Sequence, residues 1–161
     1  MRVLLLAASA LAVPSFVFAQ SPTAPPAPQH AIVAVPGAIT WGAAPAALPP
    51  GAKLAVLEGD PTQPGAFTMR LWMPDGYTIP PHFHAVAEHV TVIQGAFLVG
   101  MGEQLDASKF TELPTGTFGL IPPGMKHFAR AKGEVVLQLH GVGPWGLTYV
   151  NPADDPRRRN P

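Results

Sequence analysis

The chain reads Gly76-Tyr-Thr-Ile-Pro-Pro-His82-Phe-His84-Ala-Val-Ala-Glu88, and His127 follows about forty residues later. On a β-strand, residues two apart lie on one face and about 7 Å apart, so His82 and His84 can share one metal ion. Glu88 is an even number of positions from both histidines, so on a strand its side chain would lie on the same face. The two prolines before His82 disfavour a helix, on which the two imidazoles would point about 200° apart. Three imidazoles and one carboxylate in this order predict a metal site.

The spacing of this stretch resembles the first sequence motif of the cupin superfamily. Every fixed position of that motif is matched, by Gly76, His82, His84, Glu88 and Gly95. The resemblance implies that the two histidines and the glutamate are metal ligands.

A second segment resembles the second cupin motif. Its fixed positions are matched by Gly116, Pro122, Gly124 and His127, and only the last position departs, where Ala131 replaces the usual asparagine. That asparagine is not a metal ligand in the family, so the change concerns local turn geometry. The resemblance implies that His127 completes the ligand set.

The resemblance covers about residues 52 to 150 and implies an all-β fold, a single cupin barrel of the double-stranded β-helix or jelly-roll-like kind. The residues themselves also favour strands, because short apolar runs are bounded by proline and glycine. We expect strands at 31–35, 53–58, 67–73, 89–93, 96–101, 117–121, 127–131, 135–140 and 147–150. A hairpin turn is expected at Gln94-Gly95, and the one candidate helix is a short turn over 41–48.

The first nineteen residues have the pattern of a secretory signal peptide. Arg2 supplies the charged start, residues 3–18 are apolar, and Val17-Phe18-Ala19 resembles a cleavage site before Gln20. The apolar run is interrupted by Pro14 and is shorter than the roughly 20 residues that a membrane span requires. We therefore expect cleavage, export to the periplasm and no membrane span.

The remaining chain is long enough for one domain. We expect a proline-rich disordered linker over 20–30, the cupin barrel over 31–152 and a flexible basic tail over 153–161. Cysteine is absent, which excludes disulfides and thiolate ligands. The ten basic and ten acidic residues balance, so no nucleic-acid partner is expected. Cupins commonly pair through barrel faces or exchanged N-terminal strands, and residues 31–35 would suit exchange, so a homodimer is a candidate assembly.

Three neutral imidazoles and one carboxylate suit a divalent first-row ion, and Fe, Mn, Ni, Cu and Zn all remain open. Gln138 and His140 share one face of the penultimate strand. That face either lines the barrel, which would make both residues catalytic groups that orient substrate or relay protons, or it faces solvent. His89 has the opposite parity to Glu88, so we expect it on the outer face.

Strand alternation also places three cations outside the barrel, namely Arg70, Lys126 and Arg130. The aromatic residues around the motifs, Trp145 among them, are expected to pack in the core or at interfaces. An apolar pocket without a cation argues against sugar-phosphate or dicarboxylate substrates. We favour a metal-dependent, dioxygenase-like oxidoreductase acting on a small organic molecule. The alternatives are a non-catalytic module that binds a metal or small ligand, and a metal-dependent isomerase.

Overall fold

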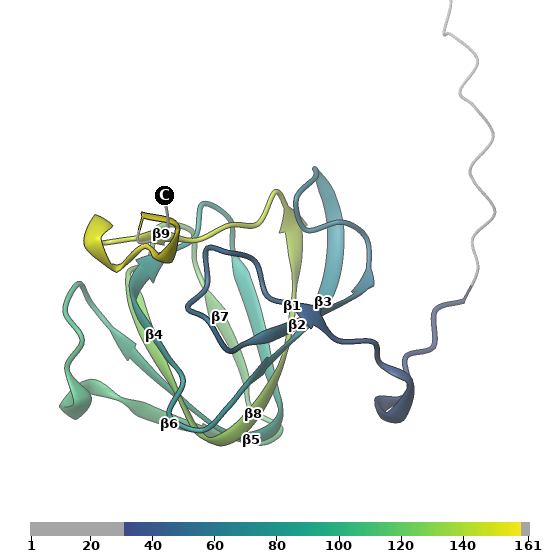
Figure 1. Ribbon diagram of the computed structural model, residues 1–161, viewed down its shortest axis with the longest axis horizontal. Helices are drawn as coiled ribbons and strands as arrows, with labels where there is room; N and C mark the ends of the chain where they lie inside the picture. Colours follow the sequence, from purple (N-terminus) through teal and green to yellow (C-terminus); the bar gives the residue numbers. More distant parts are fainter. Residues whose placement is uncertain (1–30, 159–161) are drawn as a thin grey trace, which may run out of the picture. The chain divides into compact units, whose positions relative to one another are not determined.

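Antiparallel strands dominate the computed structural model, which describes residues 31–158 (Figure 1). The strands are β1 Gly42–Ala43, β2 Lys53–Glu58, β3 Gly65–Met73, β4 Thr78–Phe83, β5 Glu88–Met101, β6 Thr111–Pro114, β7 Phe118–Ile121, β8 His127–Gly143 and β9 Thr148–Tyr149. The described residues also include four short 3₁₀ helices, of which η1 Pro36–Ala38 precedes β1, η2 Ala107–Lys109 joins β5 to β6, and η3 Pro152–Asp154 and η4 Pro156–Arg158 follow β9. Within the described range, no helix has the length and apolar character that crossing a membrane requires. The prediction of a single all-β barrel is confirmed.

Two long strands, β5 and β8, connect the parts of the barrel. β8 pairs with β4 near its start, with β3 along its second half and with β5 along most of its length. β5 also pairs with β7 near its start and with β6 near its end. The sheet therefore curls on itself (Figure 1). This register sets His82, in β4, directly opposite His127 at the start of β8.

Gly95 forms a bulge within β5, and the hairpin predicted at Gln94-Gly95 is wrong. Its φ is +80°, and the register with β8 shifts on both sides of Gln94. A Cβ at Gly95 would lie 2.2 Å from the backbone oxygen of Glu134, so this close approach needs glycine. The bulge lets one strand bend and continue, which makes a single strand of the two predicted. β8 likewise runs unbroken through the segments predicted separately at 127–131 and 135–140.

The N-terminal part of the described chain also differs from the prediction. Residues 31–35 pair with no strand, and Ile32 and Val33 remain 62% and 81% exposed, so apolar burial does not hold this segment as a strand. The segment 41–48 contains β1 and a turn in place of a helix, because Pro45 has no amide hydrogen to donate within it. The expected signal peptide and linker lie outside the described residues.

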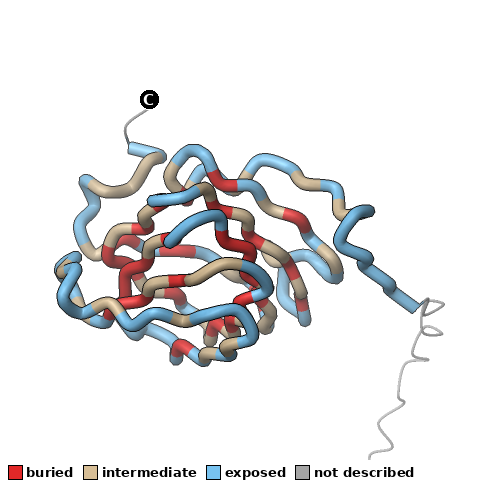
Figure 2. Tube along the Cα trace, turned by 90° about the horizontal axis from the view of Figure 1, so that it is seen from below, coloured by how far each residue is buried: buried red, intermediate tan, exposed pale blue. Residues whose placement is uncertain are grey.

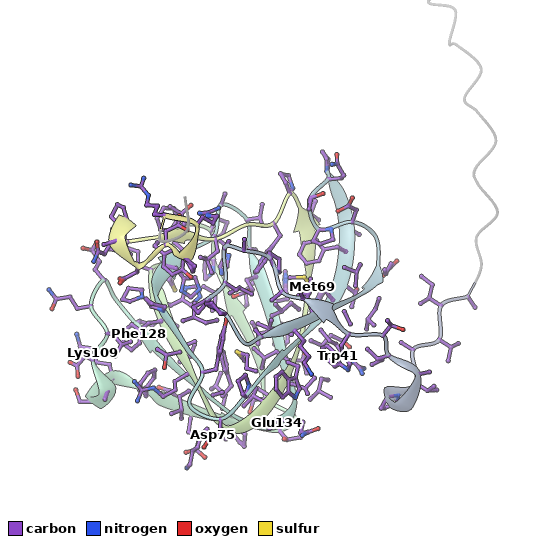
Figure 3. All side chains as sticks on the ribbon, viewed as in Figure 1. Trp41, Met69, Asp75, Lys109, Phe128 and Glu134 are labelled. Carbon is purple, nitrogen blue, oxygen red and sulfur yellow. The ribbon has the colours of Figure 1, made fainter. Side chains whose placement is uncertain are left out.

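Alternate side chains of the strands fill the barrel interior. In β3, Phe67, Met69, Leu71 and Met73 are buried and their neighbours are not, as a period of two requires. Figure 2 shows the buried positions gathered along the strands, and Figure 3 labels Lys109 at the periphery. Phe128 is also buried, but it packs on the other face of the sheet against Phe110. Burying each such apolar side chain stabilises the fold by about 1.5–3 kcal/mol. The barrel wall around the site is therefore rigidly packed.

The described part of the C-terminal segment, for which a flexible tail is predicted over 153–161, has short-range structure. It forms η3 and η4, and Arg157 donates two hydrogen bonds from its guanidinium to the carboxylate of Asp155. The Asn151 side chain also accepts a hydrogen bond from the backbone N–H of Ala153. The segment through Arg158 thus has local structure of its own.

Candidate metal centre

The four predicted ligands lie together at one end of the barrel. His82 belongs to β4, His84 follows that strand directly, Glu88 begins β5 and His127 begins β8. The three histidines are 2% exposed and Glu88 is 8% exposed. Buried polar side chains are rare unless they are paired or bind a ligand, so this cluster calls for a chemical role.

All three imidazoles are held by the same kind of hydrogen bond. The Nδ1 atoms of His82, His84 and His127 lie 2.7, 2.7 and 3.0 Å from the backbone oxygens of Pro80, Gly146 and Met125. A carbonyl oxygen only accepts, so each Nδ1 carries the hydrogen and each Nε2 keeps a free lone pair. The Nε2 of His84 is buried and has no hydrogen-bond partner. This is the tautomer and orientation that a metal-binding histidine requires.

The donor atoms converge on one space. The three histidines each offer a nitrogen within 4.8 Å of the others. The Oε2 atom of Glu88 lies 3.5 Å from Nε2 of His84 and 3.8 Å from Nε2 of His127. Donors on opposite sides of one ion stand about 4 Å apart, so the spacing fits a single ion with little adjustment. The residues present therefore fit a metal with three nitrogen ligands and one oxygen ligand.

Burial shifts the protonation of all four groups. It lowers the pKa of His84 and His127, and it lowers the pKa of His82 further because two other imidazoles lie beside it. Burial raises the pKa of Glu88 to about 7, although His127 and the nearby indole N–H of Trp145 act in the opposite direction. That indole forms no hydrogen bond of normal geometry. At neutral pH the imidazoles are neutral, and an arriving cation would displace the proton that Glu88 partly retains.

The space beside the four ligands is small and apolar. It leaves about 20 Å³ open to a water-sized sphere, which is room for roughly one water molecule. Its apolar wall includes Leu71, Ile79, Val90, Phe97, Leu137 and Leu139. Among the described residues that line it there is no lysine or arginine, in line with the outward placement expected for Arg70, Lys126 and Arg130.

The structure places Gln138 and His140 on the outer face, so the interpretation of these residues as catalytic groups lining the barrel is wrong. Leu137 and Leu139 line the cavity, and the alternation of β8 turns their neighbours outward. Gln138 accepts a hydrogen bond from Arg70 on the neighbouring strand at 3.3 Å. The His140 ring stacks on His89, with centroids 4.8 Å apart. His89 lies on the outer face, as its parity predicts.

The sequence assigned Trp145 only to core or interface packing, and the structure places it at the site. Its indole stacks on His84 with centroids 5.1 Å apart and an interplanar angle of 22°, and it forms part of the cavity wall. It lies between β8 and β9, in the segment Gly143-Pro-Trp-Gly146. An aromatic residue flanked by glycines and a proline is the only signal that sequence offers, and spacing does not connect it to the motifs.

Comparisons with known proteins agree with this fold. The family described as "Domain of unknown function (DUF4437)" matches residues 44–155, which include all four candidate ligands. The chain belongs to this family. A comparison of the DUF4437 chain with curated proteins gave no match.

Solved structures similar to the DUF4437 chain include several cupins. The polyketide cyclase RemF from Streptomyces resistomycificus has a TM-score of 0.65 at 15% identity, covering 79% of this chain and 90% of its own. An RmlC-like cupin from Shewanella frigidimarina has a TM-score of 0.51 at 16% identity, covering 68% and 87%. Salicylate 1,2-dioxygenase from Pseudoaminobacter salicylatoxidans has a TM-score of 0.51 at 17% identity, covering 65% and 30%. At these identities the likeness shows the fold alone, and the cupin barrel is confirmed.

Proposed function

We propose that this DUF4437 chain is a metal-dependent oxidoreductase of the dioxygenase type that acts on a small organic molecule. The observation that carries the proposal is the common orientation of three buried imidazoles, each donating its Nδ1 hydrogen to a backbone carbonyl. Together with Glu88 they offer three nitrogens and one oxygen, which on a six-coordinate ion leaves positions for substrate and dioxygen.

The residues of the chain have distinct parts in this proposal. His82, His84 and His127 would hold the ion, and Glu88 would bring negative charge to it and give up its proton on binding. A bound Fe, Mn, Ni, Cu or Zn ion would supply Lewis acidity, and a redox-active one would also supply electrons to dioxygen. The apolar wall would exclude bulk water, and the absence of a lining cation favours a neutral substrate.

A non-catalytic metal-binding module is the second candidate. The small volume of the cavity favours it, because about 20 Å³ does not hold an organic substrate beside the ligands. An ion bound there would be shielded from most molecules, as in a structural or storage site.

Oxygen uptake separates the two candidates. The purified chain, stripped of metal and then loaded in turn with iron, manganese, nickel or copper, would be mixed with β-diketones, catechols and flavonols in an oxygen electrode. We expect uptake with at least one pair of metal and substrate, and its loss in His127→Ala. His140→Ala is the matched control, since that ring lies on the outer face. Stoichiometric metal binding without uptake for any pair would favour the binding module.

We also propose that the protein is exported and that the mature chain starts at Gln20. The charged start, the short apolar run and the small residues before the cleavage site support this. Intact mass spectrometry of protein from its native cells would test it. A chain that retains Met1 would contradict the proposal.

A further inference from the structure

Trp145 separates two spaces. On one side its indole covers His84 and closes the cavity beside the metal ligands. On the other side it lines a second pocket of about 200 Å³, here called the groove. Leu48 and Leu147 are the other residues common to both linings. The barrier between cavity and groove is therefore a few side chains thick.

The groove has an apolar floor. Apart from Thr62 and Arg157, its lining is apolar side chain or glycine, and it includes Pro45, Ala47, Leu54, Pro61 and Met69. An indole that turned away from His84 would meet an apolar surface there, so the turn would not expose the ring fully to water.

The backbone beneath the indole is fixed on both sides. The backbone N–H of Trp145 donates to the backbone oxygen of Pro61 at 2.6 Å, and the backbone oxygen of Gly146 accepts from Nδ1 of His84 at 2.7 Å. Lifting the loop would break both bonds and release a metal ligand. Rotation of the side chain breaks neither. The buried indole Nε1 forms no hydrogen bond of normal geometry, so leaving this position costs the ring only its weaker interaction with the Glu88 carboxyl.

The part of the wall that lies on paired strands cannot open by a shift of its backbone. Leu71, Val90, Leu137 and Leu139 belong to strands paired on both sides, and their displacement would break sheet hydrogen bonds. A ring-sized molecule does not fit the small cavity.

We propose that Trp145 determines which molecules reach the metal centre: with the indole on His84, only molecules of about the size of water or dioxygen enter, and a planar, ring-sized organic ligand enters when the indole turns into the groove. The inference rests on the proposed metal centre, and it names the substrate class as single-ring, uncharged or weakly acidic organic molecules with an oxygen atom to present to the metal.

The test measures ligand entry and not turnover. Wild type, Trp145→Ala and Trp145→Phe would be loaded with Co(II) under nitrogen and mixed with azide or 4-nitrocatechol in a stopped-flow instrument, with visible absorption as the signal. Trp72→Phe is the control, because Trp72 lies on the outer face of β3 against Lys53. Equilibrium Co(II) affinity, measured first, would show that the ligand set is intact in each variant.

We expect 4-nitrocatechol to bind Trp145→Ala at least about tenfold faster than wild type, and Trp145→Phe to be intermediate, because a step that must precede binding slows association. The association rate of azide should change less than about twofold in any variant, because azide needs little space. Equal 4-nitrocatechol rates in wild type and both Trp145 variants would overturn the proposal, as would an equal acceleration of azide. If Trp145→Ala does not fold, the 4-nitrocatechol rate of Trp145→Phe relative to wild type decides the test.

The outcome is separable from that of the proposed function. A ligand-size effect without oxygen uptake would sustain the role of Trp145 and overturn the oxidoreductase. Failure of the wild type to bind Co(II) would overturn both.

Discussion

Replacing Glu88 with glutamine should stabilise the metal-free protein at high pH and weaken metal binding. Burial raises the pKa of this carboxyl from 4.5 to about 7, so the folded chain holds the proton more tightly than the unfolded chain. The stability that the protonated form contributes is complete below pH 4.5 and is lost as pH rises through 7. Above pH 7 the loss approaches about 3 kcal/mol. Glutamine keeps the shape and does not ionise, so it escapes this loss.

The measurement is the free energy of unfolding by urea for both chelator-treated proteins from pH 5 to pH 9. We expect Glu88→Gln to gain about 2–3 kcal/mol on wild type across that range, or roughly 5–10 °C in Tm. The contributions of the three histidines, whose lowered pKa values remove stability as pH falls, should largely cancel in the comparison. Glu134→Gln, at an exposed position, is the control (Figure 3). If the free energies of unfolding of wild type and Glu88→Gln changed with pH in parallel, the reasoning would be refuted. When metal is present, wild type should be the more stable of the two, because the variant lacks a charged ligand.

Three further predictions follow from the site and the packing. His127→Ala should lose most of the bound metal, measured by elemental analysis, and His89→Ala should lose none. Equal metal contents in the two variants would mean that the metal site lies elsewhere. Removing the metal from wild type should lower Tm, since an ion at a hundred times its Kd stabilises by about 2.7 kcal/mol, and an unchanged Tm would mean that no such ion is bound. Gly100→Ala should lower the free energy of unfolding by about 1–3 kcal/mol, because its Cβ would lie 2.3 Å from the Phe128 ring, whereas Gly119→Ala meets no atom within 4 Å and should change it little; similar urea midpoints for the two would contradict this packing.

Local pattern predicted the ligand cluster because two-residue spacing on a strand needs no knowledge of the rest of the fold. His82 and His84 depend only on alternation at the end of β4, whereas Glu88 begins β5 after a bend, so its place came from the spacing of the motif. The runs of apolar residues predicted an all-β fold, and the resemblance to cupins predicted the single barrel.

Gln138 and His140 could not be placed, because the sequence predicts two strands where β8 is one. With a break assumed between 127–131 and 135–140, the inward parity of His127 could not be carried along to Leu137. Glycine at bulges and hairpins looks alike in sequence, and only the pairing partner distinguishes them. The position of Trp145 depends on how the loop between β8 and β9 closes over the barrel, and no hydrophobic periodicity in the sequence predicts that.

The acceptors that orient the three imidazoles are backbone oxygens, those of Pro80, Met125 and Gly146. Every amino acid carries such an oxygen, so replacing the side chain at any of these positions leaves the acceptor in place if the chain path is kept. Tautomer control at this centre thus makes almost no demand on side-chain identity beyond the ligands themselves. Sequences can therefore drift far around such a site and keep its coordination.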